Sequence, residues 1–258
     1  NMKRNMRQKY SSLQNAIRLL NVFSVEEPEL GISALAEKLG ISKSAVHRLV
    51  TSMASEGFIA KDITTNMYRL GISILGLGNV VTSTMKIYRV ALPVLQDLGK
   101  LAKESVHLGI FRDDKVVFLN RIDSPRSISS LSVMGSQVPA HCTCSGLVFL
   151  AYQPKETVER IIAKGLTAYT EKTVTDRKTL LQVLENVRRQ GYAVCIEEYQ
   201  KGVTSVAAPV FNARRQVIAT VSTPGPTKRM NKETIEQLVK WVTQAAQEIS
   251  QRYQLETE

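Results

Sequence analysis

The sequence lacks any apolar run of the roughly 18 to 20 residues that a membrane-spanning helix requires, and no hydrophobic stretch follows its polar, basic beginning. We therefore expect neither a membrane span nor a signal peptide. Cysteine is also scarce, with Cys142, Cys144 and Cys195 as the only three in the chain. Because an odd, small number argues against a disulfide framework, we expect a cytoplasmic protein with free thiols.

Nucleotide-binding signatures are missing as well. The sequence has no P-loop, and the Gly-Leu-Gly at 76–78 lacks the preceding strand that a dinucleotide-binding turn needs. Neither an internal repeat nor a low-complexity segment occurs. With 43% hydrophobic and 22% charged residues over 258 positions, the composition indicates an ordinary globular protein that is long enough for two domains.

The net charge of +11 suits a polyanionic partner such as DNA. Its distribution weakens that inference. Residues 1–85 carry ten Lys and Arg against six Asp and Glu, whereas residues 86–258 carry 24 against 17. Since the excess is spread over the chain, charge alone does not locate a nucleic-acid-binding region.

The first seventy residues contain three predicted helices. Residues 12–23 place an apolar face at helical spacing, made of Leu13, Ala16, Ile17, Leu20 and Phe23. A second helix follows Ser33, the predicted N-cap, and ends at Gly40. A third runs from Lys43 to about Ser55 with Ser42 as its N-cap. Two short helices joined by a tight Gly-Ile-Ser turn indicate a helix-turn-helix.

The third helix separates into an apolar face and an outer face of hydrogen-bond donors that has no acidic residue before Glu56. Such a face suits a DNA major groove, although a merely solvated amphipathic helix would look similar. Residues 57–70 then alternate as two strands around a polar turn, which predicts a β-hairpin wing. The candidate DNA contacts are Ser33, Lys43, Ser44, His47, Arg48, Thr51, Lys61, Asn66 and Arg69.

These residues resemble the N-terminal domain of the IclR family of bacterial transcription regulators. The resemblance rests on Leu35-Ala36-Glu37-x-Leu39-Gly40-Ile41, Lys43-Ser44, Arg48-Leu49-Val50 and Gly57-Phe58. It implies a winged helix-turn-helix DNA-binding domain over residues 8–71, a linker helix over residues 72–90 and an effector-binding domain over residues 91–258.

Beyond residue 90, helices and strands are mixed. Helices are expected over residues 91–104 with Pro93 in the first turn, twice between 143 and 164, from the cap Thr175 to about 190, and over 231–253. Strands are expected on both sides of Asp113-Asp114 and over 128–133, 191–195, 204–211 and 216–223. Frequent hairpins favour an antiparallel α+β domain. The IclR resemblance continues through residues 135–152 and 188–226, and it implies a GAF-like fold.

Matching the family's ligand pocket by position gives eight candidate effector-binding residues. The polar candidates are Cys195, Glu198, Ser205 and Ser222, and the wall candidates are Leu131, Met134, Cys144 and Leu147. The resemblance implies a carboxylate, sugar acid or aromatic acid as the effector. Two departures leave its chemical class open, because the family's Gly-Lys is Gly146-Leu147 here and the second serine of its Ser-x-Ser-Gly-Pro is Pro224.

Two more specific interpretations of the cysteines, a metal site and a catalytic nucleophile, have less support in the sequence. His141, Cys142 and Cys144, with Cys195 as a fourth ligand, do not follow the paired spacing of zinc sites, so we expect thiols that line a pocket and no metal. A Cys/His nucleophile would also need an orienting third group, and no catalytic signature accompanies His107 or His141.

We therefore expect a regulator without a cofactor, not an enzyme. The alternative is a small-molecule-binding enzyme that carries a winged-helix interaction domain. The expected partners are double-stranded operator DNA of pseudo-palindromic sequence, a small-molecule effector and further copies of the chain, as a dimer or dimer of dimers. A repressor of a catabolic operon is favoured over an activator.

Overall fold

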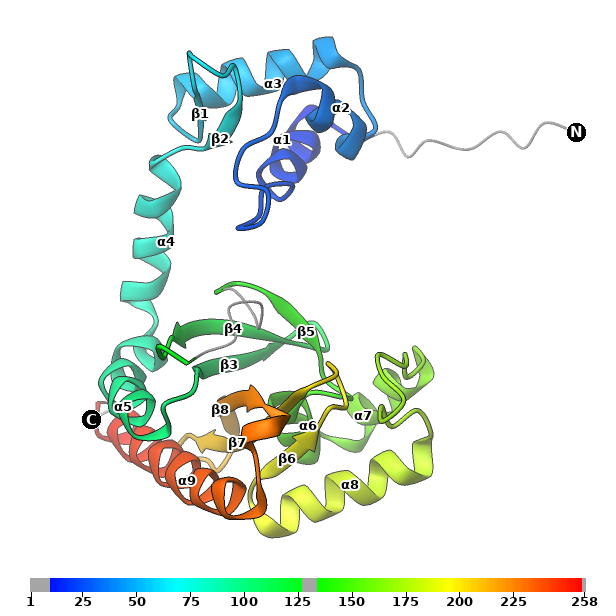
Figure 1. The fold of residues 1–258 in the computed structure, drawn as a ribbon, viewed down its shortest axis with the longest axis vertical. Helices are drawn as coiled ribbons and strands as arrows, with labels where there is room; N and C mark the ends of the chain where they lie inside the picture. The colour runs from blue at the N-terminus through cyan, green and yellow to red at the C-terminus, as the bar shows by residue number, and fades with distance from the viewer. Residues whose placement is uncertain (1–9, 127–133, 257–258) are drawn as a thin grey trace, which may run out of the picture. The chain divides into compact units, whose positions relative to one another are not determined.

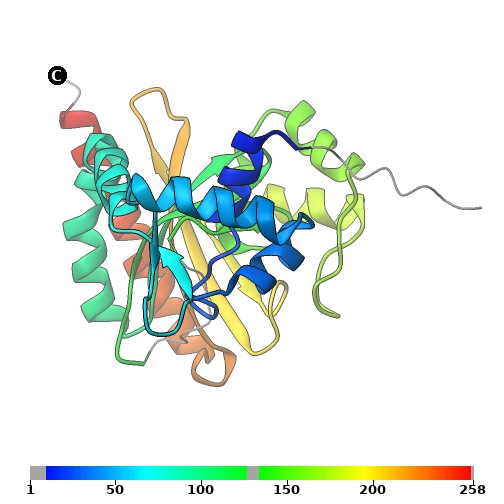
Figure 2. The same ribbon diagram turned by 90° about the horizontal axis from the view of Figure 1, so that it is seen from above.

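The computed structural model describes residues 10–126 and 134–256. The chain divides into two compact units between Val81 and Thr82, whose elements are labelled in Figure 1 and seen from a second direction in Figure 2. Within the described residues, no helix is long and apolar enough to cross a membrane.

The smaller unit is a winged helix-turn-helix, as the sequence predicts. It contains α1 (Ser12–Leu20), α2 (Ile32–Leu39), α3 (Lys43–Ser55), the antiparallel strands β1 (Ile59–Lys61) and β2 (Tyr68–Leu70), and the start of α4 (Ser73–Thr84). Its core is formed by Leu19, Leu35, Val46, Val50 and Ile59, all fully buried. Ser42 caps α3, because its side chain accepts a hydrogen bond from the Ala45 N–H at 3.2 Å.

Two details of this unit differ from the sequence prediction. The predicted apolar face of α1 is right only in part. Leu20 and Phe23 pack against the core, whereas Leu13 and Ile17 are 71% and 53% exposed and Leu19, which was not predicted, is buried. The helix also ends at Leu20, before Phe23. Ser33 does not cap α2, because the N-cap is Gly31 and Ser33 lies exposed in the first turn. Gly31 has the extended backbone that an N-cap needs and offers no side-chain acceptor.

The expected linker helix over residues 72–90 is interrupted. α4 ends at Thr84, and α5 (Lys86–Ala102) begins after Met85, whose backbone is extended. Ile87 and Val90 are buried in the core of the larger unit, so the apolar pattern of α5 starts earlier than the sequence prediction placed it. Pro93 consequently lies inside α5 and not in its first turn, where a proline would have left no hydrogen bond unmade.

The larger unit is built on an antiparallel sheet, which confirms the predicted α+β class. In its described part, six strands lie in the order β5-β4-β3-β8-β7-β6. Their bounds are β3 (Val106–Arg112), β4 (Lys115–Ile122), β5 (Gln137–Pro139), β6 (Ala193–Ile196), β7 (Val203–Phe211) and β8 (Val217–Pro226). Asp113 and Asp114 have φ angles of 51° and 64°, the left-handed pair that closes a two-residue hairpin between β3 and β4.

Helices cover both faces of this sheet (Figure 1). α5 and α9 (Lys232–Leu255) bury one face against alternate residues of β3, β7 and β8. The helix α6 (Cys144–Ala151) lies on the other face and packs in turn against α8 (Arg177–Gln190), with α7 (Lys155–Ala163) between them in sequence. A short 3₁₀ turn, Thr227–Arg229, precedes α9.

The cap of α8 corrects another expectation. Asp176 is the N-cap and accepts a hydrogen bond from the Thr179 N–H at 2.8 Å, so Thr175 lies one residue outside the helix. An aspartate oxygen is the stronger acceptor for this orphan N–H because it is charged. The predicted strand over residues 128–133 falls outside the described residues.

Candidate functional site

The outer face of α3 carries side chains that point into solvent. Lys43, Ser44, His47, Arg48 and Thr51, here called the reading face, are all exposed. Within the described part of the chain, the side chains of Lys43, His47 and Arg48 form no hydrogen bond or ion pair. Thr51 donates to the carbonyl of His47 at 2.8 Å. Three donors are thus available to an outside partner, as the sequence predicts.

The wing is ordered by one carboxylate. Asp62 accepts hydrogen bonds from the backbone N–H groups of Thr64 and Thr65 at 2.8 and 2.9 Å, and these bonds hold the pKa of Asp62 below its ordinary value. Asn66 closes the turn with a φ of 58°. The tip presents Ile63, 90% exposed. Sequence reasoning missed Ile63, although an apolar residue inside a polar turn was a usable signal.

The remaining predicted DNA contacts of this unit divide into two kinds. Lys61, Asn66 and Ser33 are exposed, with the ammonium of Lys61 5.9 Å from the Tyr68 ring centroid. Arg69 differs because its guanidinium lies 3.4 Å from a carboxylate oxygen of Glu29. A phosphate would have to compete with that ion pair for Arg69.

A cavity of about 320 Å³ opens on the α6 side of the sheet in the larger unit. Strand register builds its floor. Ser222 lies between His107 and Ala207 in one row, and Ser205 lies between Cys195 and Pro224 in the next. Since side chains alternate along each strand, the polar residues of these rows reach the cavity while their neighbours Val206 and Val221 enter the opposite core.

The structure brings five of the eight predicted effector residues together. Cys144, Cys195, Glu198, Ser205 and Ser222 line the cavity. The other three are Leu147, Met134 and Leu131. Leu147 is buried in the core behind α6, Met134 is 57% exposed away from the described lining, and Leu131 lies outside the described residues.

Sequence reasoning missed other lining residues from the strands and the loop after β6, among them His107, Phe118, Val138, Tyr199 and Val203. The alternation of residues 106–112 was a signal for His107, because it places that ring on one face of a strand. The short strand β5, which supplies Val138, gave no comparable pattern.

Burial shifts the pKa values of the titratable groups in the cavity wall toward their neutral forms. It lowers the pKa of His107 to about 3 and raises that of Cys142 to about 12. A hydrogen bond to Cys144, together with burial, raises the pKa of Cys195. Burial also raises the pKa of Glu198 to about 7, so at neutral pH this carboxyl is part protonated. Neither lysine nor arginine occurs among the described lining residues.

The thiols show no metal-binding arrangement. The Cys144 thiol lies 2.9 Å from the carbonyl oxygen of Ser205, and the His141 ring nitrogen Nε2 lies 2.9 Å from the carbonyl oxygen of Thr167. His141 does not line the cavity. Across residues 10–126 and 134–256, no three His, Cys, Asp or Glu side chains gather in a way that could hold a metal ion.

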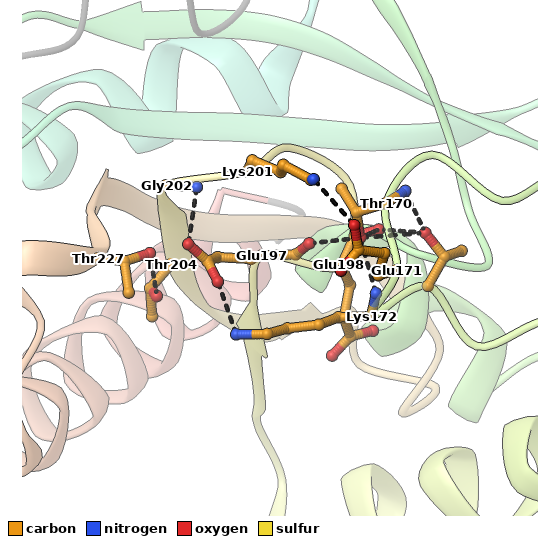
Figure 3. A network of polar contacts seen from close by, with 10 residues as sticks. Thr170, Glu171, Lys172, Glu197, Glu198, Lys201, Gly202, Thr204 and Thr227 are labelled. Carbon is orange, nitrogen blue, oxygen red and sulfur yellow. Dashed lines mark hydrogen bonds and ion pairs between the residues drawn. The ribbon is translucent and has the colours of Figure 1, made fainter.

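A network of polar contacts positions Glu198 at the cavity (Figure 3). The hydroxyl of Thr170 donates to the carbonyl of Glu197 at 2.7 Å, and that of Thr173 donates to the carbonyl of Glu198 at 2.6 Å. The Glu197 carboxylate pairs with Lys172 at 2.6 Å and accepts from the Gly202 N–H at 2.8 Å. These bonds also hold Glu197 at a φ of 61°, a left-handed conformation immediately before the lining residue Glu198.

The first turn of α6 also faces the cavity. Thr143, at the N-cap, donates to the carbonyl of Pro139 at 2.6 Å and does not cap the helix. Ser145 is 2% exposed, and its hydroxyl has no hydrogen-bond partner in the described structure. Gly146 allows α6 to pack directly against the backbone of Ala140, because a Cβ at this position would lie 2.2 Å from the Ala140 carbonyl oxygen. The unpartnered Ser145 hydroxyl and the first turn of α6 therefore face a cavity whose described lining carries no lysine or arginine.

A winged helix-turn-helix with free donors, followed by a unit with a ligand-sized cavity, defines a transcription regulator with DNA-binding and effector-binding domains. Residues 12–62 match the family described as "IclR helix-turn-helix domain", and residues 79–251 match "Bacterial transcriptional regulator IclR C-terminal". The chain belongs to the IclR family of bacterial transcription regulators.

Individual relatives support the same family assignment. The HTH-type transcriptional regulator KdgR of Escherichia coli is 33% identical over 239 residues, which cover 90% of each chain. The IclR transcriptional regulator of Alicyclobacillus acidocaldarius is 28% identical, with a TM-score of 0.83 over 95% of this chain and all of that one. An IclR homolog from Microbacterium hydrocarbonoxydans, solved in complex with 4-hydroxybenzoate, is 26% identical, with a TM-score of 0.83 over 94% and 99%. The family consists of regulators, which disfavours the enzyme alternative.

Proposed function

We propose that this regulator represses a catabolic operon by binding a pseudo-palindromic operator and that a small organic acid controls its occupancy. The observation that carries the DNA-binding part is the reading face, where Lys43, His47 and Arg48 stand exposed without internal partners. Arg48 is the residue we expect to read a base edge, since a guanidinium makes paired bonds to guanine. Lys43 lies in the first turn of α3, where a phosphate also meets the positive helix end.

The proposed assembly is a symmetric dimer or a dimer of dimers. Two reading faces would then meet half-sites whose centres lie roughly 34 Å apart, or a multiple of that spacing. Effector binding in the larger unit would alter the spacing or rigidity of the two faces. A coupling of about 1–3 kcal/mol between the sites changes operator occupancy several-fold.

The cavity supports a small acid as effector. Its lining offers the hydroxyls of Ser145, Ser205 and Ser222 and the first turn of α6 to a carboxylate. Glu198 fits such a ligand when it keeps its proton, because a neutral carboxyl donates a hydrogen bond where a carboxylate would repel the acid. The complex of the Microbacterium relative with 4-hydroxybenzoate shows that an aromatic acid is bound within this family.

The test begins with a duplex selected by the protein from a random DNA library. Its affinity should fall linearly with the logarithm of salt concentration, as phosphate contacts require. Arg48→Ala should abolish specific binding, while Lys38→Ala, an exposed cation of the same unit that already pairs with Glu27, should bind nearly as the parent does. Unchanged affinity in Arg48→Ala would refute the placement of the reading face.

The effector is found by a thermal-shift screen of aromatic acids, sugar acids and small keto acids. A true effector stabilises the parent protein and Arg48→Ala equally, because its cavity belongs to the other unit. For a repressor, the same compound releases the selected duplex. Tighter DNA binding with effector would reverse the proposed sign, and a salt-independent interaction would favour a winged helix that contacts protein.

A further inference from the structure

A second cavity in the larger unit carries two arginines and no acidic residue. Its volume is about 740 Å³, and it is bounded by β7, the ends of α6 and α8, the turn after β7 and one side of α9. Arg188 and Arg215 are its charged lining residues in the described structure, where neither forms an ion pair. It shares no described lining residue with the 320 Å³ cavity on the α6 side of the sheet, which we propose for the effector and here call the effector cavity.

Each of the two guanidinium groups lies near an aromatic ring of the cavity lining. The Cζ of Arg215 lies 5.0 Å from the Phe211 ring centroid, and the Cζ of Arg188 lies 6.0 Å from that of Tyr152. The two rings themselves meet edge to face at 5.3 Å. Burial raises the pKa of the Tyr152 phenol, and both arginines act against that rise. The two positive charges therefore act on the same hydroxyl, and each exposed guanidinium makes a cation–π contact with its ring.

The α9 side of the cavity supplies neutral polar groups. The Thr243 hydroxyl is buried and has no hydrogen-bond partner among the described residues. Gln247, Gln251 and Gln254 follow it at one-turn spacing and are exposed. Their side chains make no hydrogen bond elsewhere in the described structure. Amides and a hydroxyl in this arrangement can donate to and accept from the hydroxyl groups of a ligand.

We propose that this cavity binds a phosphorylated sugar or polyol, with the phosphate toward Arg188 and Arg215 and the hydroxyl groups along α9. Two guanidinium groups provide paired donors for a dianion, which a phosphate ester matches better than a single carboxylate. The volume lies within the range of small-molecule sites. This site goes beyond the proposed function, because it would report a second metabolite to the same regulator.

The experiment is isothermal titration of the full chain with glucose 6-phosphate and glycerol 3-phosphate, with glucose and inorganic phosphate in parallel. We expect saturable binding of at least one ester, with a dissociation constant of about 1 mM or tighter, weaker binding of phosphate and none of glucose. Arg188→Gln and Arg215→Gln should each weaken ester binding about tenfold.

Matched controls lie next to each arginine. Arg189→Gln and Arg214→Gln remove the same charge from exposed positions that do not line the cavity, so ester affinity should hold. Glu198→Gln should also leave it unchanged. An equal loss in the control variants would indicate diffuse charge, and a loss in Glu198→Gln would place the ligand in the effector cavity. Either result overturns the proposal.

Two further outcomes would overturn it as well. One is the absence of saturable binding with both esters. The other is a change in sedimentation mass of Arg188→Gln or Arg215→Gln without ligand, because the cavity would then be an interface between copies of the chain. Neither outcome depends on the residues of the reading face, so failure of this proposal would leave the proposed DNA-binding function unaffected.

Discussion

The reading face and the effector cavity place their functional side chains in opposite relations to the fold. Lys43, His47 and Arg48 are exposed on α3, and the packing of that helix depends on other residues, such as Val46 and Val50. In the cavity, by contrast, Cys144 and Cys195 belong to a buried core cluster and line the site at the same time. Substitutions on the reading face should therefore leave the core packing intact, whereas substitutions in the cavity wall must preserve it.

The largest expected effect concerns packing at the cavity and is measured against a glycine in α4 that packs against nothing. Gly146→Ala places a methyl group 2.2 Å from the Ala140 carbonyl oxygen, where backbone must move, and should lower the free energy of unfolding by about 3 kcal/mol. Gly76→Ala in α4 meets no atom within 4 Å and should raise it by about 0.5–1 kcal/mol. Scanning calorimetry of both variants measures the difference. A Gly146→Ala protein as stable as the parent would contradict the tight seat of α6.

A second test concerns the proton on Glu198. Because its pKa is raised from 4.5 to about 7, the folded state holds a proton that the unfolded chain releases between these values. This contribution to stability is fully present below pH 4.5 and is lost as pH rises through 7. We expect about 2 kcal/mol, less than the full linkage value, because the half-buried carboxyl keeps part of its hydration.

Glu198→Gln keeps the shape of the side chain and removes the titration. Its stability relative to the parent should therefore rise between pH 5 and pH 8, measured by chemical denaturation at each pH. Ser222→Ala, which alters the same cavity without a titrating group, is the control and should show no such trend. A parallel pH dependence of parent and Glu198→Gln would show that Glu198 does not change its protonation between pH 5 and pH 8 and would contradict the raised pKa.

The contrast also explains how far the sequence could predict the molecule. The exposure of the reading face follows from helical period along one local segment, so the sequence was sufficient to place its five residues on the outer side of α3. Ser33 and Thr175 were mistaken for N-caps because residues with cap-like side chains lie close to each helix start, whereas the helices begin after Gly31 and Asp176. Pro93 misled the start of α5 because a proline inside a helix is costly, and burial of Ile87 and Val90 outweighs that cost.

The cavity required information that local pattern does not contain. Ser205 and Ser222 share it because β7 and β8 pair in a particular register and β8 also pairs with the distant strand β3. The family resemblance supplied these two serines by position, whereas composition could not. Leu147 was assigned to the wall because its position matched the family pocket, but the orientation of α6 turns it into the core. His107 was considered only as a catalytic base, since nothing in the sequence shows that β3 lies beside β8.

The smallest expected effect concerns the wing, where one residue is both near the proposed DNA surface and needed for the local structure. Asp62 faces solvent beside the proposed DNA surface, yet its carboxylate orders the loop through Thr64 and Thr65. Asp62→Asn keeps the accepting oxygen and removes a negative charge near phosphates, so affinity for the selected duplex should rise about two- to fivefold at low salt. Asp62→Ala loses the same charge and also both backbone bonds, and should bind more weakly than Asp62→Asn because the loop must be ordered on binding.

Fluorescence titrations at two salt concentrations separate the contributions, since only the charge effect fades with salt. Identical affinities of the parent and both variants would mean that the wing does not approach DNA, and the reading face would then act alone.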